Sequence, residues 1–70
     1  MKYNYDDLFM KIGTGKIITK IPLFIKEREY KLNDELDDED ANFVNHNVHN
    51  SFTGQKLRKG LVIDGAVDMN

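Results

Sequence analysis

The sequence predicts a small α+β protein with a single domain that spans residues 1–70. Three observations carry this prediction: an apolar stripe with helical spacing near the N-terminus, a cluster of β-branched and aromatic residues around the only proline, and a second apolar stripe after an acidic stretch. Seventy residues allow one hydrophobic core, and no internal repeat or linker divides the chain. The expected order of elements is αββαβ.

The first element is a short amphipathic helix over about residues 4–12. Asn4 is a favourable N-cap, and Gly13 is a favourable residue just beyond a helix end. Two aspartates in the first turn suit the helix dipole. The apolar face has the i, i+3, i+4, i+7 spacing of a helix and consists of Tyr5, Leu8, Phe9 and Ile12.

Two strands follow, at about residues 16–21 and 23–32, and we expect them to pair with each other. Pro22 separates them because it cannot donate a hydrogen bond to a sheet. Charges alternate in sign from Lys26 to Lys31, a pattern that suits the solvated face of a strand. The residues that favour strands here are Ile17, Ile18, Thr19, Phe24, Ile25 and Tyr30.

A second helix is expected to begin near Asp37, followed by a polar turn over 51–60 and a strand at 61–63. The Asp64–Gly65 dipeptide is a turn signal that favours a small hairpin at the end of this strand. The apolar positions of the second helix share one face and are Leu36, Phe43, Val44 and Val48.

The most unusual feature is the acidic segment, residues 34–40, in which six of seven side chains are carboxylates. No cation occurs between Lys31 and Lys56, so residues 32–54 carry a charge of −6 in a chain whose net charge is −2. Blocks of like charge are typical of disordered or interacting segments. The carboxylates belong to Asp34, Glu35, Asp37, Asp38, Glu39 and Asp40.

The charge density of the acidic segment matches that of a nucleic-acid backbone. A helical segment would carry one charge per about 1.8 Å, and an extended segment one per about 3.8 Å. Duplex DNA carries one charge per about 1.7 Å of axis, and a single strand one per about 3.4 Å. Either conformation would attract proteins that bind DNA. Two simpler origins stay open: the first turn of a helix, which favours acidic residues, and a solvated loop.

Motifs for phosphate binding, metal binding and catalysis are incomplete. The GTGK stretch at 13–16 lacks the spacing of a phosphate-binding loop. His46 and His49 lie three residues apart, yet no cysteine or further histidine completes a zinc site. A calcium loop beginning at Asp38 would need glycine where Phe43 stands. We therefore expect no enzymatic activity, no metal and no cofactor.

A chain of this length buries only about 60% of the surface that its unfolded form exposes. Because no cysteine is present to form a disulfide, we expect a second subunit to add stability and predict a homodimer. No apolar stretch reaches the roughly 20 residues of a membrane helix. Asp6 and Asp7 stand where a signal peptide would carry its apolar run. These observations predict a cytoplasmic protein.

The chain resembles the small early host-takeover proteins of lytic phages of Gram-positive bacteria. The resemblance rests on the acidic segment and on a very small, cysteine-free chain rich in lysine and asparagine. Several such proteins are DNA mimics, and one type inhibits the histone-like nucleoid protein HU. The resemblance implies an inhibitor that binds a basic host DNA-binding protein, without contacting nucleic acid itself. We expect its surface to comprise the six carboxylates, with Asn42, Phe43 and Asn45 at the edge.

A nucleic-acid-binding regulator is the alternative from a different class. Its surface would combine the basic strands of residues 16–31 with the turn at 55–59. The interleaved Glu27 and Glu29 and the acidic balance of the chain weaken this alternative. An enzyme or metal protein is a third possibility. The residues of the basic surface would be Lys16, Lys20, Lys26, Arg28, Lys31, Lys56, Arg58 and Lys59, with Phe24 and Tyr30.

Overall fold

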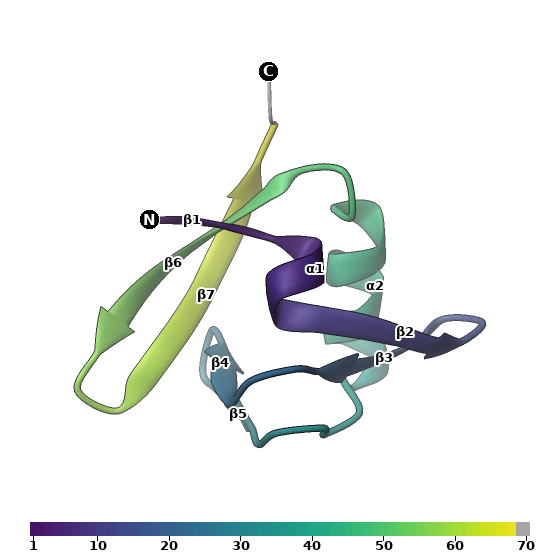
Figure 1. Cartoon of the computed structure of the whole chain (residues 1–70), viewed down its shortest axis with the longest axis horizontal. Helices are drawn as coiled ribbons and strands as arrows, with labels where there is room; N and C mark the ends of the chain where they lie inside the picture. Colours follow the sequence, from purple (N-terminus) through teal and green to yellow (C-terminus); the bar gives the residue numbers. More distant parts are fainter. Residues whose placement is uncertain (69–70) are drawn as a thin grey trace.

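A computed structural model describes residues 1–68 and confirms the α+β class, with a larger and a smaller sheet and two short helices in that range (Figure 1). In Figure 1 the larger sheet lies on the left, and the helices and the smaller sheet lie on the right. In chain order the elements are β1 (Lys2–Asn4), α1 (Tyr5–Leu8), β2 (Phe9–Gly13), β3 (Lys16–Thr19), β4 (Leu23–Ile25), β5 (Arg28–Tyr30), α2 (Asp38–His46), β6 (Ser51–Leu57) and β7 (Gly60–Val67).

The larger sheet has the strand order β1-β6-β7-β4-β5. All of its neighbours are antiparallel except β4 and β7, which run parallel with Phe24 opposite Val62 and Ile25 opposite Ile63. The parallel pair is possible because the long connection from β4 to β7 includes β5, α2 and β6. The sheet therefore joins residues from both halves of the chain.

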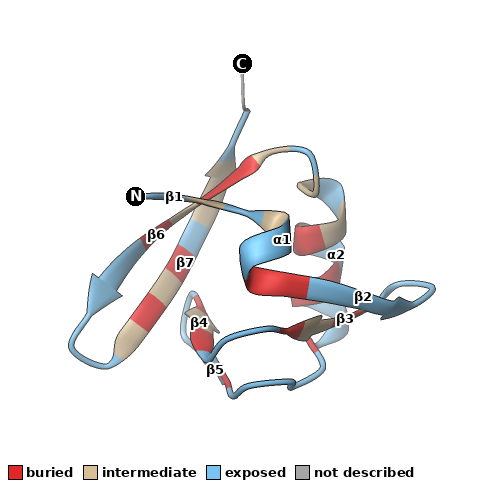
Figure 2. Cartoon of the chain, in the orientation of Figure 1, coloured by how far each residue is buried: buried red, intermediate tan, exposed pale blue. Residues whose placement is uncertain are grey.

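The core lies between the larger sheet and the elements that cover one of its faces. Alternate residues of β4 and β7 point inward, so buried and partly exposed positions alternate along these strands (Figure 2). Phe52 on β6 is fully buried and packs edge-on against Phe9 and Phe43, with ring centroids 5.4 and 5.8 Å away. This aromatic cluster connects β2 and α2 to the sheet.

The smaller sheet is a hairpin of β2 and β3, which we call the arm. Phe9 and Ile17 are buried at its inner side, whereas every residue from Met10 to Lys16 is exposed. Gly15 in the turn adopts a φ of 70°, a left-handed conformation that glycine tolerates best. Figure 1 shows the tip of the arm projecting away from the larger sheet.

The predicted helix over 4–12 is correct only for its first half. α1 ends at Leu8, and residues 9–13 form β2 instead. The Thr14–Gly15 turn lets this segment fold back against β3, so the backbone hydrogen bonds of a hairpin replace those of a helix. Ile12, placed on the apolar helix face by its spacing, is half exposed.

The expected pairing of strands 16–21 and 23–32 is wrong. β3 pairs with β2, and residues 23–30 form their own hairpin from β4 and β5. Lys26 in its turn has a φ of 56°, an uncommon conformation for a residue with a side chain. The turn is held to the sheet because the Lys26 N–H donates to the Ile63 carbonyl at 2.9 Å.

The C-terminal region holds more strand than expected. Residues 51–57, predicted as part of a turn, form β6, and the Arg58–Lys59 turn connects it to β7. Gly65 lies within β7 opposite Thr53, so the Asp64–Gly65 pair makes no turn. The pairing register shifts between Thr53 and Gly54: Thr53 lies opposite Gly65, whereas Gly54 lies opposite Ile63, so β7 carries one extra residue there, as in a β-bulge. The second helix begins at Asp38, within one residue of the predicted start, and ends at His46, so Val48 lies beyond the helix face on which its spacing placed it.

Candidate protein-binding surface

The acidic segment is extended in its first part and helical in its last part. Residues 34–36 run beside β3: the Thr19 N–H donates to the Asp34 carbonyl at 3.1 Å, and the Leu36 N–H donates to the Ile17 carbonyl at 2.9 Å. Asp38 to Asp40 form the first turn of α2. Leu36, in the middle, is buried in the core. The segment is thus neither uniformly extended nor uniformly helical, and it is anchored at its centre.

Tyr30 on β5 anchors the start of α2. Its hydroxyl donates a hydrogen bond to the Asp40 carboxylate and accepts one from the Asp37 backbone N–H at 3.1 Å. Tyr30 is 4% exposed, so these bonds lie in protected surroundings. Burial and the hydrogen bond to Asp40 raise the pKa of the Tyr30 phenol above its ordinary value. The neutral phenol therefore remains a donor over the physiological pH range.

Arg28, two residues before Tyr30, pairs with two carboxylates of the acidic segment. Its Nε lies 3.1 Å from Asp37 Oδ2, and its Nη1 lies 3.0 Å from Asp40 Oδ2. Hydrogen bonding by Tyr30 and Asp40, with the nearby charge of Asp37, raises the pKa of the Arg28 guanidinium. Although no cation occurs between Lys31 and Lys56 in the sequence, the fold therefore gives Asp37 and Asp40 a cationic partner.

The sequence-predicted surface residues divide into an outer and an inner group. Asp40 is buried, and Phe43 is partly buried against Phe52, so both point toward the protein interior. Asp34 is exposed and accepts a hydrogen bond from the Lys31 N–H at 2.7 Å. The other exposed members are Glu35, Asp37, Asp38, Glu39 and Asn42, whereas Asn45 is half-buried.

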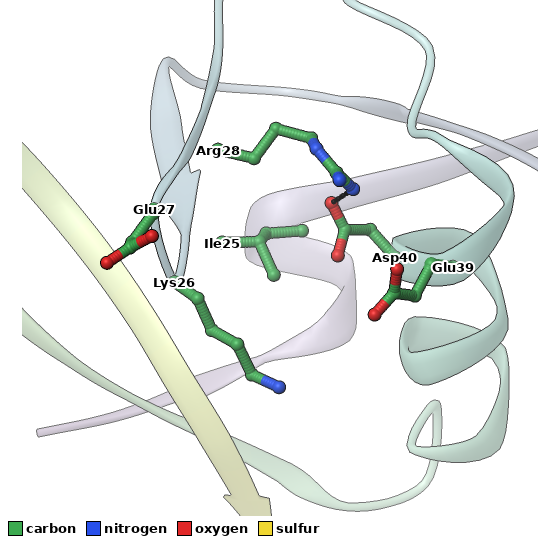
Figure 3. A pocket seen from close by; sticks show the side chains of 6 residues that line it. All are labelled: Ile25, Lys26, Glu27, Arg28, Glu39 and Asp40. Atoms are coloured by element: carbon green, nitrogen blue, oxygen red, sulfur yellow. Dashed lines mark hydrogen bonds and ion pairs between the residues drawn. The ribbon is translucent and has the colours of Figure 1, made fainter.

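Two shallow depressions flank the ion pairs of Arg28. The first, of about 540 Å³, is lined by the β4–β5 turn and the start of α2, with Ile25 as its apolar part (Figure 3). In Figure 3, Arg28 reaches from β5 toward Asp40 on α2, while Lys26 and Glu39 extend into the space below. The second depression, of about 530 Å³, is lined by Arg28, Glu35, Leu36, Asp37, Asp38 and Glu39.

Arg28 and Tyr30 were not predicted as partners of the acidic segment. The signal that points to them is the two-residue spacing on a strand, which places both side chains on one face. Their neighbour Glu29 lies opposite Phe24 and belongs to the other face. The contact with α2 depends on a chain reversal between residues 31 and 37, which includes Asn33 at a φ of 66°.

The two histidines of the possible metal motif have different surroundings. His46 Nδ1 lies 2.8 Å from the Asn42 carbonyl oxygen, and His49 lines a depression together with α1. Across residues 1–68, no group of three or more His, Asp or Glu side chains is arranged to hold a metal ion. No helix in that range is long and apolar enough to cross a membrane.

The basic residues of the alternative surface are spread over the molecule. Lys16 lies at the turn of the arm, whereas Lys56, Arg58 and Lys59 lie around the β6–β7 turn, at the opposite end of the view in Figure 1. The Lys59 ammonium sits 4.7 Å from the centre of the Phe24 ring. These cations do not form one continuous face.

Comparisons of the chain with protein-family models, with curated proteins and with solved structures found no match.

Proposed function

We propose that this protein binds a basic DNA-binding protein and blocks its binding to DNA, with the acidic segment standing in for the phosphate backbone. The observation that carries the proposal is the anchoring of that segment. Tyr30 and Arg28 hold the buried carboxylate of Asp40, and Arg28 also pairs with the exposed carboxylate of Asp37, while Asp38 and Glu39 remain exposed beside them. An anchored row of charges loses less conformational entropy on binding than a flexible loop does.

The acidic segment keeps a large negative net charge even when its ion pairs with Arg28 are counted. Six carboxylates and the single Arg28 guanidinium sum to −5 within the surface. A surface with this potential accelerates the encounter with a positively charged partner and orients it. A basic groove that normally accepts DNA provides the complementary potential.

The class of partner follows from the resemblance to phage host-takeover proteins, which points to a nucleoid protein of the HU type. Such a partner would require the inhibitor to act in the host cytoplasm. The protein needs no catalytic group for this role, because occupying the DNA-binding surface is sufficient. A nucleic-acid-binding regulator receives less support, because its basic residues are distributed over opposite ends of the molecule.

The test is a competition experiment with a purified HU-type protein bound to a fluorescent DNA duplex. The variant Asp38→Asn with Glu39→Gln removes two exposed charges and leaves the pairs of Arg28 with Asp37 and Asp40 intact. We expect the variant to displace DNA about tenfold less effectively, because each exposed ion pair is worth up to about 1 kcal/mol. Rising salt should weaken the wild-type protein more than the variant.

The matched control is Asp6→Asn with Asp7→Asn, which removes the same number of exposed carboxylates from α1. The control should compete as well as the wild type. Equal loss in both variants would mean that net charge alone matters. Undiminished competition by the Asp38 and Glu39 variant, with its fold intact by circular dichroism, would refute the mimic proposal.

A further inference from the structure

The outward side of the arm exposes apolar side chains. Met10 lies opposite Ile18, and Ile18 lies opposite Glu35, so these three side chains share one face across the arm and the start of the acidic segment. The alternate residues Phe9, Ile17 and Leu36 point the other way and are buried. Met10 is 45% exposed. Ile12 is 50% exposed, but the register of β2 against β3 shifts between Lys11 and Gly13, so strand alternation does not assign Ile12 to this face.

The apolar side chains are flanked by a cation on one side and by a carboxylate on the other. Lys16 lies two residues before Ile18 on β3 and therefore shares its face, toward the tip of the arm. Glu35 lies beside Ile18 on the acidic side. From Leu8 to Lys26 the chain has no acidic residue, so the arm is uniformly basic. We call the set Met10, Lys16, Ile18 and Glu35 the arm face.

We propose that the arm face is the contact between two copies of this chain. A two-fold axis through Ile18 that brings Lys16 of each copy onto Glu35 of the other places Ile18 against Ile18 at the centre. This operation crosses the two arms steeply, which is one of the arrangements that packed sheets adopt. Both charge pairs then form at once, as an isologous interface requires.

A second copy is the occupant that best fits the arm face, because the face carries both an apolar centre and its own charge complement. A purely anionic partner would match Lys16 and be repelled by Glu35. Edge-to-edge pairing of two β2 strands fits less well, because exposed Lys11 lies in the middle of that edge and would oppose itself. Contact through the face avoids this repulsion.

The arm face overlaps the surface of the proposed function only at Glu35. Asp38 and Glu39 lie beyond it on α2 and stay available to a partner in the dimer. The inference does not depend on that function, because the oligomeric state is measured without any partner.

Sedimentation equilibrium of the wild-type protein over about 1 to 100 micromolar, a range that suits a small interface, should show a dimer that dissociates on dilution. The charge reversals Lys16→Glu and Glu35→Lys should each weaken the dimer by about tenfold or more, because each change turns two attractive pairs into repulsive ones. Combining both reversals should restore the dimer. Lys16 and Glu35 form no ion pair within one described chain, so a change confined to the monomer does not predict this rescue.

Lys56→Glu on β6 is the matched control, because it changes the net charge by the same amount as Lys16→Glu at an exposed residue away from the arm. It should leave the dimer intact. A wild-type protein that stays monomeric at every concentration, a double reversal that fails to restore the dimer, or an equal loss in the Lys56→Glu control would each overturn the proposal. Monomers that co-sediment with vesicles of anionic phospholipid would also overturn it and assign the arm to a lipid surface.

Discussion

The acidic segment and the arm lie side by side and are both rich in exposed charge, yet they are held in different ways. The acidic segment sends Leu36 and Asp40 into the protein and is tied down by Tyr30 and Arg28. At the tip of the arm, residues 10–16 are all exposed, so the tip is held only by the pairing of β2 with β3. Anchoring through buried groups fixes a surface before it meets a partner, whereas a hairpin tip without buried side chains gains stability when something packs against it.

Tyr30→Phe should have the largest effect among substitutions that test this difference. The change removes one hydroxyl that donates to Asp40 and accepts from the Asp37 N–H. Leaving these polar groups without their partner should lower the unfolding free energy by about 1–3 kcal/mol. Chemical denaturation measures the loss, and hydrogen exchange should show faster opening of the first turn of α2. If the unfolding free energy is unchanged, the acidic segment is not anchored through Tyr30.

Replacing glycine by alanine should have different effects in the larger sheet and in the arm. A Cβ on Gly54 would lie 2.8 Å from the Val62 carbonyl oxygen, so backbone would have to move. We expect Gly54→Ala to destabilise the protein by about 1–3 kcal/mol. A Cβ on Gly13 would meet nothing closer than 4.0 Å, so Gly13→Ala on the arm should be neutral or slightly stabilising. Thermal unfolding of both variants measures the two losses of stability side by side. Equal destabilisation by the two substitutions would contradict the expected difference.

Alkaline pH should weaken the anchor. Because the pKa of Tyr30 is raised in the folded protein, its neutral form is favoured by folding. This contribution is fully present below the unfolded pKa of about 10 and is lost as the pH rises through the folded pKa. Urea unfolding on both sides of pH 10 should show a smaller decline in Tyr30→Phe than in the wild type. Tyr5, whose pKa is also raised by burial and by Asp6, accounts for part of the remaining decline. An identical decline in both proteins would exclude Tyr30 as a contributor.

Met10→Ser on the arm should have the smallest effect on folding. Met10 is 45% exposed and faces away from the core, so the unfolding free energy measured on the monomer at low concentration should change by no more than about 0.5 kcal/mol. The same variant should weaken self-association, because it removes an apolar side chain from the arm face. A large loss of monomer stability would show that Met10 contributes to the packing of the folded monomer.

The class of the fold and the location of the concentrated charge follow from local features of the sequence. Helical spacing with an acidic first turn predicted α2 beginning near Asp37, and the β-branched residues around Pro22 predicted strands there. These signals are local, since they depend on neighbours within a few residues. The concentration of six carboxylates in residues 34–40 is likewise a property of the sequence alone.

Strand pairing and the outward or inward orientation of each charge depend on contacts between distant parts of the chain. Residues 9–13 have helical spacing, yet pairing with β3 makes them a strand, because non-local hydrogen bonds and core contacts outweigh weak local preferences. Asp38 and Asp40 look equivalent in the sequence. Asp40 binds Tyr30 and Arg28 because β5 lies beside α2 in the folded protein. Asp38 and Glu39 belong to the same turn of α2 and remain exposed.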